Sequence, residues 1–385
     1  MANKNRLLSI FMFSLAVTAC GGGGDSGSGA PTNPTNPTNP TTPTNTLDDE
    51  FGLWLTDLSE KVILIGYQGL EQSAEAMLGA SESFCALSSP VSSNLNDLRG
   101  SWSELNASWQ QIQWLKVGPI VEQSRLFRMQ FWPDANDAVG RGVDNLLLEP
   151  SITVELVAQQ NVGAQGIPAL EYLLFAASTD SLLSAADKDK RCDAVQSIAG
   201  NIKNMATDVY TGWQASGGNY TGQLTQGTGD FTSRKDAVEE VVTNWLEQIE
   251  KVKDEKMLKP LADAAPGLPN IAEFALSQDS LASVKLNLAS FAAIYSAGDG
   301  HGFDDILKDH LEQTSLADNM QAKLDAAIAS AGGLQGDYAD LLNDEAARTT
   351  IAETIQAVRE VRDLLTADFV QTLDINIGFN SNDGD

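Results

Sequence analysis

The sequence predicts an all-α protein with two helical bundles of the four-helix up-and-down type, which follow a disordered N-terminal linker. Ala, Leu, Glu, Gln and Asp are abundant, whereas aromatic residues make up only 7% of the 385-residue chain. This composition favours helix over strand. Apolar residues also recur at helical spacing in both halves of the chain. The hydrophobic content of 42% is typical of a chain that folds around a core.

The charge balance excludes several classes of partner. The chain has 24 basic and 52 acidic residues, which gives a net charge of −28. Nucleic-acid binding requires a basic surface, so we expect no nucleic-acid partner. Docking on anionic lipid by charge alone is disfavoured for the same reason. Repulsion between like charges further favours a monomer.

Residues 1–19 have the features of a lipoprotein signal peptide. Lys4 and Arg6 precede an apolar stretch that is too short to span a bilayer. Small residues then precede Cys20, as in the bacterial lipobox, where cleavage leaves a lipidated cysteine. The alternative is an ordinary secretory signal with a chance cysteine. We expect a lipid-anchored, periplasm-facing protein of the bacterial cell envelope, and Gly21 favours the outer membrane.

The next segment, residues 20–46, is a linker of low complexity, and the folded body follows it. Its Gly, Ser, Pro, Thr and Asn residues offer little apolar surface, so we expect disorder. The Pro-Thr-Asn repeat predicts an extended spacer of about 3 Å per residue. A glycine-rich stretch at 215–230 is predicted to be a long loop. It suggests an N-terminal bundle over 47–222 and a C-terminal bundle over 223–385.

Amphipathic patterns place the main helices of both bundles. Each stripe of apolar residues is expected to face a bundle core rather than a cofactor. Breaks are predicted at 264–269, with a new helix near Asn270, and at 296–303. The clearest stripes lie within 51–70, 238–252, 281–295 and 351–369.

The cysteines predict one disulfide bond. Removing the lipidated Cys20 from the count leaves Cys85 and Cys192. An exported protein meets an oxidising compartment, so these two are expected to pair. The alternative is two buried free thiols.

Standard catalytic motifs for nucleotide binding, zinc peptidases and serine hydrolases are absent from the sequence. The chain has only two histidines. His301 is expected on an exposed glycine-rich loop, with a weak metal contact near Asp304 and Asp305 as the alternative. His310 is expected on the surface.

The most informative stretch runs from Gln165 to Phe175. Pro168, followed by helix-forming residues, predicts the first turn of a helix. Glu171 then lies near the positive end of that helix. Two interpretations remain open: Glu171 caps the amides of its own helix, or it is a functional carboxylate beside an interior cavity.

This stretch resembles the G-x-H-x-x-E signature of the imelysin-like family, with Gly166 and Glu171 in place. The resemblance covers most of residues 50–385. It is strongest to the family's branch of periplasmic lipoproteins. The other segments that carry it are 125–134, 139–143, 246–261 and 361–369, together with the C-terminal residues 378–385.

The resemblance implies two helical bundles, an envelope location and a link to bacterial iron uptake. Family members have been called metallopeptidases, with the signature His and Glu as the suspected metal or catalytic pair. Here Pro168 stands at the His position, and proline has no ligand atom. A conventional zinc site needs about three protein ligands, so Glu171 alone does not suffice. Iron(III) held by oxygen ligands that include Glu171 remains an alternative.

Six residues are candidate ligand contacts. Arg125 and Arg128 share a helix face and are suited to hold a carboxylate. The alternative is a structural ion pair with Glu171 or Asp144. Trp132 is expected to pack at the end of that helix or to stack on a ligand. The remaining candidates are Gly166, Pro168 and Glu171.

Three functions remain. The first is a non-enzymatic ligand-binding lipoprotein in iron or haem uptake, with its ligand in a cleft between the bundles and with other envelope proteins of iron uptake as partners. The second is a structural or adaptor lipoprotein that binds protein partners. The third is a metallopeptidase, which the missing histidine disfavours.

Overall fold

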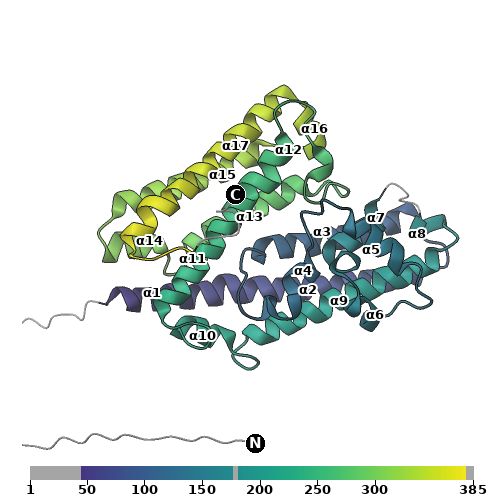
Figure 1. The fold of residues 1–385 in the computed structure, drawn as a ribbon, viewed down its shortest axis with the longest axis horizontal. Helices are drawn as coiled ribbons and strands as arrows, with labels where there is room; N and C mark the ends of the chain where they lie inside the picture. The colour runs from purple at the N-terminus through teal and green to yellow at the C-terminus, as the bar shows by residue number, and fades with distance from the viewer. Residues whose placement is uncertain (1–44, 177–180, 379–385) are drawn as a thin grey trace, which may run out of the picture. The chain divides into compact units, whose positions relative to one another are not determined.

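The computed structural model describes residues 45–176 and 181–378, and these residues form helices without any strand (Figure 1). This confirms the predicted all-α class. The predicted signal peptide, Cys20 and nearly all of the linker lie outside the described residues, as does the end of the chain from residue 379.

Three long helical stretches dominate the first half. Thr46 caps the first of them through a reciprocal pair of hydrogen bonds with Asp49. α2 packs against both α3 and α9, so the three form one layered group (Figure 1). Their bounds are α1 Leu47–Leu58, which continues through the π-helical η1 Ser59–Ile63 into α2 Leu64–Cys85, then α3 Ser92–Ile112 and α9 Lys188–Trp213.

Short elements fill the interval between α3 and α9. Among them, α7 packs against α3, α5 and α9, which surrounds this apolar helix with other helices. The elements are η2 Gly118–Ile120, η3 Glu122–Ser124, α4 Arg125–Met129, α5 Ala138–Leu146, α6 Val154–Gln159, η4 Val162–Ala164, α7 Gly166–Phe175 and α8 Ser181–Ser184.

The second half contains another set of long helices. α15 packs against α13 and α17, and α13 also packs against α3 of the first half. The elements are α10 Tyr220–Gln226, α11 Arg234–Glu250, η5 Lys251–Leu258, α12 Lys259–Leu261, η6 Pro269–Ile271, α13 Ser280–Tyr295, α14 Phe303–Asp305, η7 Ile306–His310, α15 Thr314–Gly333, α16 Tyr338–Asn343, α17 Glu345–Leu364, η8 Leu365–Phe369 and α18 Val370–Thr372.

Helix α1 packs against α10 and α11, although it begins the first half of the sequence. The core therefore continues from one half of the chain into the other through α1 and through the contact of α13 with α3. The boundary near residue 222 stays a prediction.

Two local predictions were wrong. The segment 215–230 is not a continuous loop, because it contains α10. Tyr220 and Leu224, four residues apart, are both buried, and the Tyr220 ring lies edge-on to Trp213 at 4.9 Å between centroids. The helix expected near Asn270 is only a single 3-10 turn, and the next helix begins at Ser280.

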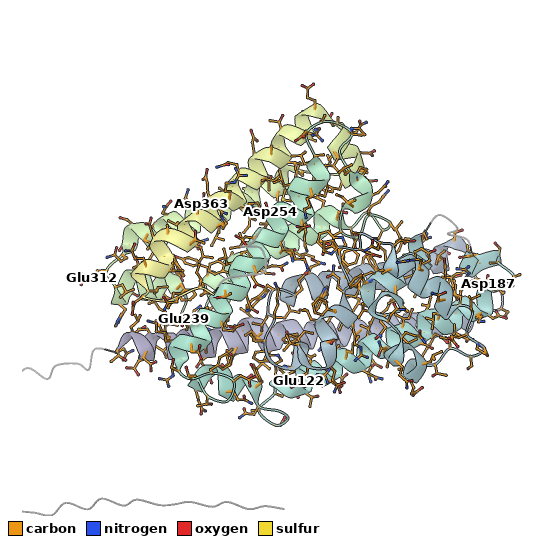
Figure 2. All side chains as sticks on the ribbon, viewed as in Figure 1. Glu122, Asp187, Glu239, Asp254, Glu312 and Asp363 are labelled. Atoms are coloured by element: carbon orange, nitrogen blue, oxygen red, sulfur yellow. A yellow bond between two sulfur atoms is a disulfide. The ribbon has the colours of Figure 1, made fainter. Side chains whose placement is uncertain are left out.

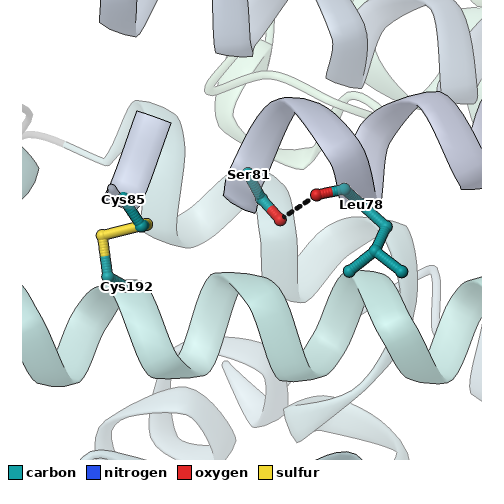
Figure 3. The surroundings of a disulfide bond; sticks show 4 residues. All are labelled: Leu78, Ser81, Cys85 and Cys192. Atoms are coloured by element: carbon teal, nitrogen blue, oxygen red, sulfur yellow. Dashed lines mark hydrogen bonds between the residues drawn. A yellow bond between two sulfur atoms is a disulfide. The ribbon is translucent and has the colours of Figure 1, made fainter. Parts of the chain in front are cut away.

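The predicted disulfide is confirmed. Cys85 ends α2 and Cys192 lies in the first turns of α9, with 5.7 Å between their Cα atoms (Figure 3). The bond ties two helices that also pack along their length. Since it closes a loop of 107 residues, the chain-entropy model assigns it about 4.7 kcal/mol.

Acidic side chains are distributed over the helices and loops of both halves rather than gathered in one place. Figure 2 labels examples on distant elements, among them Glu122, Asp187, Glu239 and Asp363. Within the described part of the chain, no helix has the length and apolarity that a membrane span requires.

Candidate functional site

The signature segment forms the start of α7, as predicted. Gln165 is the N-cap residue and Pro168 is the third residue of the helix. Gly166 has a φ of +76°, and a Cβ atom there would collide with the carbonyl oxygens of Arg128 and Met129. Glycine is therefore required for both backbone conformation and the close approach of α4.

Glu171 is buried and bound to a distant segment. Its side chain accepts hydrogen bonds from the Ser277 amide at 2.9 Å and from the Ser277 hydroxyl at 2.8 Å. Burial raises the pKa of Glu171 to about 7, and the nearby carboxylates of Asp279 and Glu273 act in the same direction. The two bonds from Ser277 oppose this rise. Glu171 therefore ties α7 to the segment that precedes α13.

A buried polar network lies beside this carboxylate. Lys256 Nζ is 2.7 Å from Glu273 Oε2, and both side chains are only 1% exposed. Lys256 also donates to Gln110 Oε1 at 2.8 Å and to Asn287 Oδ1 at 2.6 Å. Burial lowers the pKa of Lys256, whereas the neighbouring Glu273 opposes that change. Because every partner comes from a different element, the network holds α3, η5 and α13 together.

The residues at the signature do not fit a resident zinc ion. Pro168 supplies no ligand atom, and the Glu171 carboxylate is already bonded to Ser277. Across residues 45–176 and 181–378, no group of three or more His, Cys, Asp or Glu side chains is placed to hold a metal. Participation of Glu171 in binding iron(III) stays a prediction.

In the described part of the chain, Arg125 and Arg128 bond to residues other than Glu171. Arg125 is buried, donates to the Pro119 carbonyl at 2.8 Å and pairs with Asp208 at 3.3 Å. It also pairs with Glu122, so its ion pairs are with these acids rather than with Glu171 or Asp144.

Arg128 supports the signature helix. It donates to Gln165 Oε1 at 3.0 Å and to Asn201 Oδ1 at 3.2 Å, and burial lowers its pKa. The two arginines line a pocket of about 220 Å³ on this side of the molecule. Arg128 is thus a positioning residue for the N-cap of α7.

Trp132 lines a different and larger cavity, which we call the Lys251 cleft. Its volume is about 480 Å³. Its walls come from the end of α3, the segment 126–133, and one face of α11, η5 and α12. Its lining includes three aromatic side chains and three lysines, which are Trp109, Phe127, Trp132, Lys116, Lys251 and Lys259.

Two lysines of the cleft are paired and one is not. Lys116 lies 2.6 Å from Glu247, and Lys259 lies 2.5 Å from Glu255. Among the described residues, no carboxylate lies within ion-pair distance of Lys251. Its Nζ instead lies over the Trp132 ring, 5.5 Å from the centroid.

The electrostatic surroundings of Lys251 disfavour its charged form. Burial lowers the pKa of Lys251 to about 8, and the positive charges of Lys256 and Lys116 add to this effect. Glu273 and Glu255 act in the opposite direction without reversing it. Within the described residues, the cleft thus contains a cation without an ion-pair partner.

The cleft connects with the buried network. Trp109 Nε1 donates to Gln130 Oε1, and Gln130 Nε2 donates to Glu273 Oε1 at 2.7 Å. Gln130 therefore belongs both to the wall of the cleft and to the network that surrounds Lys256. The charge of Glu273 also raises the pKa of the signature carboxylate Glu171.

Sequence reasoning missed Lys251. The available signal was the spacing of Glu247, Lys251, Glu255 and Lys259, which recur every fourth residue and so share one helix face. That pattern is also typical of a solvated helix with surface ion pairs, so it does not by itself indicate a cleft.

The two histidines are partly buried rather than fully exposed, because both lie near Glu50. His301 Nε2 lies 2.6 Å from Glu50 Oε2, and His310 Nδ1 lies 3.8 Å from Glu50 Oε1. Glu50 is only 7% exposed. The loop at 296–303 and η7 fold back on the start of α1, and this brings both histidines to one carboxylate.

Comparisons with known proteins agree with this architecture. The family model described as Imelysin (Peptidase_M75) matches residues 63–365, so the chain belongs to the imelysin family. An imelysin-like protein from Psychrobacter arcticum 273-4 has a similar structure, with a TM-score of 0.73 and 19% identity, over 87% of this chain and 99% of that one.

A second solved structure has the same fold. It is named as an iron-regulated protein A precursor from Parabacteroides distasonis ATCC 8503, with a TM-score of 0.67 and 15% identity, over 86% of this chain and 97% of that one. No curated protein sequence matches the chain. At these identities the two structures establish a shared fold.

Proposed function

We propose that this protein is a non-enzymatic, ligand-binding member of the imelysin family that acts in bacterial iron acquisition. The observation that carries the proposal is the Lys251 cleft, whose volume of about 480 Å³ is typical of small-molecule sites. The name of the similar Parabacteroides distasonis protein supports the link to iron. The cleft would therefore hold an iron-bearing or iron-related small molecule.

The geometry favours binding over peptide hydrolysis. Hydrolysis by a metallopeptidase requires a metal-bound water and a nearby general base. At the signature, Pro168 replaces the histidine, and Glu171 is 6% exposed with two hydrogen bonds to Ser277. This carboxylate is a structural tie between α7 and the segment before α13.

A thermal-shift screen tests the proposal. The purified protein would be melted alone and with Fe(III), Fe(II), Zn(II) or haem. A ligand at about 100 times its dissociation constant stabilises the native state by about 2.7 kcal/mol, which raises the melting temperature by several degrees. No shift with any of these probes would contradict the proposal. Chelator-sensitive cleavage of an unfolded peptide that is lost in Glu171→Gln would establish the peptidase instead.

We further propose that Cys20 carries a lipid anchor that holds the body on the periplasmic side of the cell envelope, on the outer membrane. The sequence before Cys20 supports this, as does the Cys85–Cys192 disulfide, which is typical of an oxidising compartment. Labelled palmitate should be incorporated by the native chain and not by Cys20→Ser. Equal labelling of the two would contradict the anchor.

A further inference from the structure

Among the described residues, Lys251 is the lysine of the cleft without a carboxylate partner. The other two lysines already have carboxylate partners, Lys116 with Glu247 and Lys259 with Glu255. Lys251 is partly buried and has the Trp132 ring as its neighbour. An exposed ring contributes only about 0.5–1 kcal/mol to a cation, less than a desolvated ion pair. A ligand carboxylate would supply the missing partner.

The cleft also presents aromatic surface that a ligand can cover. Phe127 lines the cleft with 59% of its surface exposed, so a ligand in the cleft can cover apolar surface there. Trp132 is only partly buried in the same wall. Flat apolar rings of this kind stack well against another ring.

The remaining lining residues indicate how the ligand is recognised. None of the described residues that line the cleft is His, Cys, Met or Tyr. Glu247 and Glu255 also line the cleft, but they are paired with Lys116 and Lys259. Charge at Lys251 and aromatic surface are therefore the main contacts that the lining offers.

We propose that the Lys251 cleft binds an aromatic carboxylate, with the carboxylate paired to Lys251 and the ring against Phe127 and Trp132. This inference rests on the proposed function because it names the ligand class of the same cleft. The lowered pKa of Lys251 is consistent with this pairing, since burial and then the charges of Lys256 and Lys116 disfavour the protonated lysine, and a bound carboxylate would stabilise it.

Calorimetric titration with 2-naphthoate tests the inference. Two matched compounds separate the contacts: 2-naphthamide keeps the ring without the charge, and cyclohexanecarboxylate keeps the charge without the aromatic ring. We expect naphthoate to bind at least about tenfold more tightly than either, because each loses one of the two recognition elements.

Variants assign the charge to Lys251. Lys251→Met should weaken naphthoate binding by about tenfold or more, whereas Lys251→Arg should stay within about threefold of the native protein. Lys259→Met is the matched control, because that lysine belongs to the same cleft but is already paired with Glu255. It should change the affinity by less than about threefold.

Several results would overturn the inference. These are no naphthoate binding up to about 10 mM, equal binding of naphthoate and naphthamide, or equal loss in Lys251→Met and Lys259→Met. If Lys251→Met does not fold, Lys251→Arg and the matched compounds still decide the question. A melting shift with an iron probe but no naphthoate binding would contradict the aromatic-carboxylate inference and leave the proposed function standing. Naphthoate binding without any iron or haem effect would instead contradict the role in iron acquisition.

Discussion

Two lysines of the same π-helical segment, Lys251 and Lys256, have opposite surroundings. Lys256 is fully buried and is bonded to Glu273, Gln110 and Asn287. Lys251 lies on the wall of a cavity, with an aromatic ring over its charge and, within the described residues, no carboxylate at ion-pair distance. A cation whose bonds are all satisfied inside the protein stabilises the fold. A cation without a partner at a cavity remains available to a ligand.

The same contrast separates the signature carboxylate from the cleft. Glu171 is enclosed and accepts two hydrogen bonds from Ser277, so it behaves as part of the core. The Lys251 cleft has open volume, exposed Phe127 and an unmatched charge. The following variants test whether the charges in the core stabilise the fold while the charge in the cleft does not.

The largest expected effect is the loss of the buried ion pair. Lys256→Met leaves the Glu273 carboxylate buried without a cation, which should lower the free energy of unfolding by about 3–5 kcal/mol. Chemical denaturation measures this loss. The double variant Lys256→Met/Glu273→Gln should regain part of it, because the uncompensated charge is gone.

Lys251→Met is the matched control for that prediction. Because Lys251 has no ion pair among the described residues, its replacement should change stability by less than about 1 kcal/mol. A destabilisation by Lys251→Met as large as that by Lys256→Met would remove the distinction between the two lysines.

Glu171→Gln should change how stability depends on pH. The pKa of Glu171 is raised from 4.5 to about 7 in the folded protein, so the folded state holds this proton more tightly than the unfolded state. The resulting stabilisation is fully present below pH 4.5 and is lost as the pH rises through 7. Its size is about 3 kcal/mol.

Denaturation of both proteins at several pH values measures this effect. Native protein should lose stability relative to Glu171→Gln between about pH 5 and pH 8, because the glutamine cannot ionise. Asp279→Asn is a useful comparison, since burial also raises the pKa of that neighbouring carboxyl. A constant difference between native protein and Glu171→Gln across this range would show that Glu171 is not desolvated.

Gly166 links the two regions, because it packs against the carbonyls of Arg128 and Met129 just before the cleft residue Gln130. Gly166→Ala should cost about 1–3 kcal/mol of stability, since alanine at positive φ is strained and its Cβ has no room. Thermal melting measures the loss. Gly79→Ala is the control, because a Cβ there meets no atom within 4 Å, and it should be neutral or stabilising.

A smaller effect is expected for the pH dependence of ligand binding. Lys251 has a pKa of about 8, and a carboxylate prefers its protonated form. Above that pH, naphthoate affinity should fall about tenfold per pH unit, which is about 1.4 kcal/mol. Lys251→Arg should bind with little change over the same range, because arginine stays protonated. A parallel fall in both proteins would place the titration on another group.

Much of the architecture could be predicted from the sequence. The apolar stripe within 281–295 became α13, and Pro168 marked the start of α7 as expected. Helical periodicity and proline restrictions are local properties, so they can be read from neighbouring residues. The Cys85–Cys192 pairing followed from the count of cysteines in an exported chain.

The candidate site was predictable only in part. The sequence indicated Glu171 and Trp132 but could not show that one is enclosed and the other lines a cleft. It placed both histidines on the surface but gave no sign that these partly buried side chains lie near Glu50. These contacts join residues about 250 positions apart, and no local pattern reports them.

The sequence by itself determined the helical class, the disulfide and the place of the signature helix, because each depends on residue types and short spacings. Only the tertiary structure decided that Lys256 is enclosed while Lys251 faces a cavity. The two lysines are five residues apart on one segment, and their difference arises from how α3 and α13 pack against that segment. Packing sets which charges are satisfied within the protein and which remain available to a ligand.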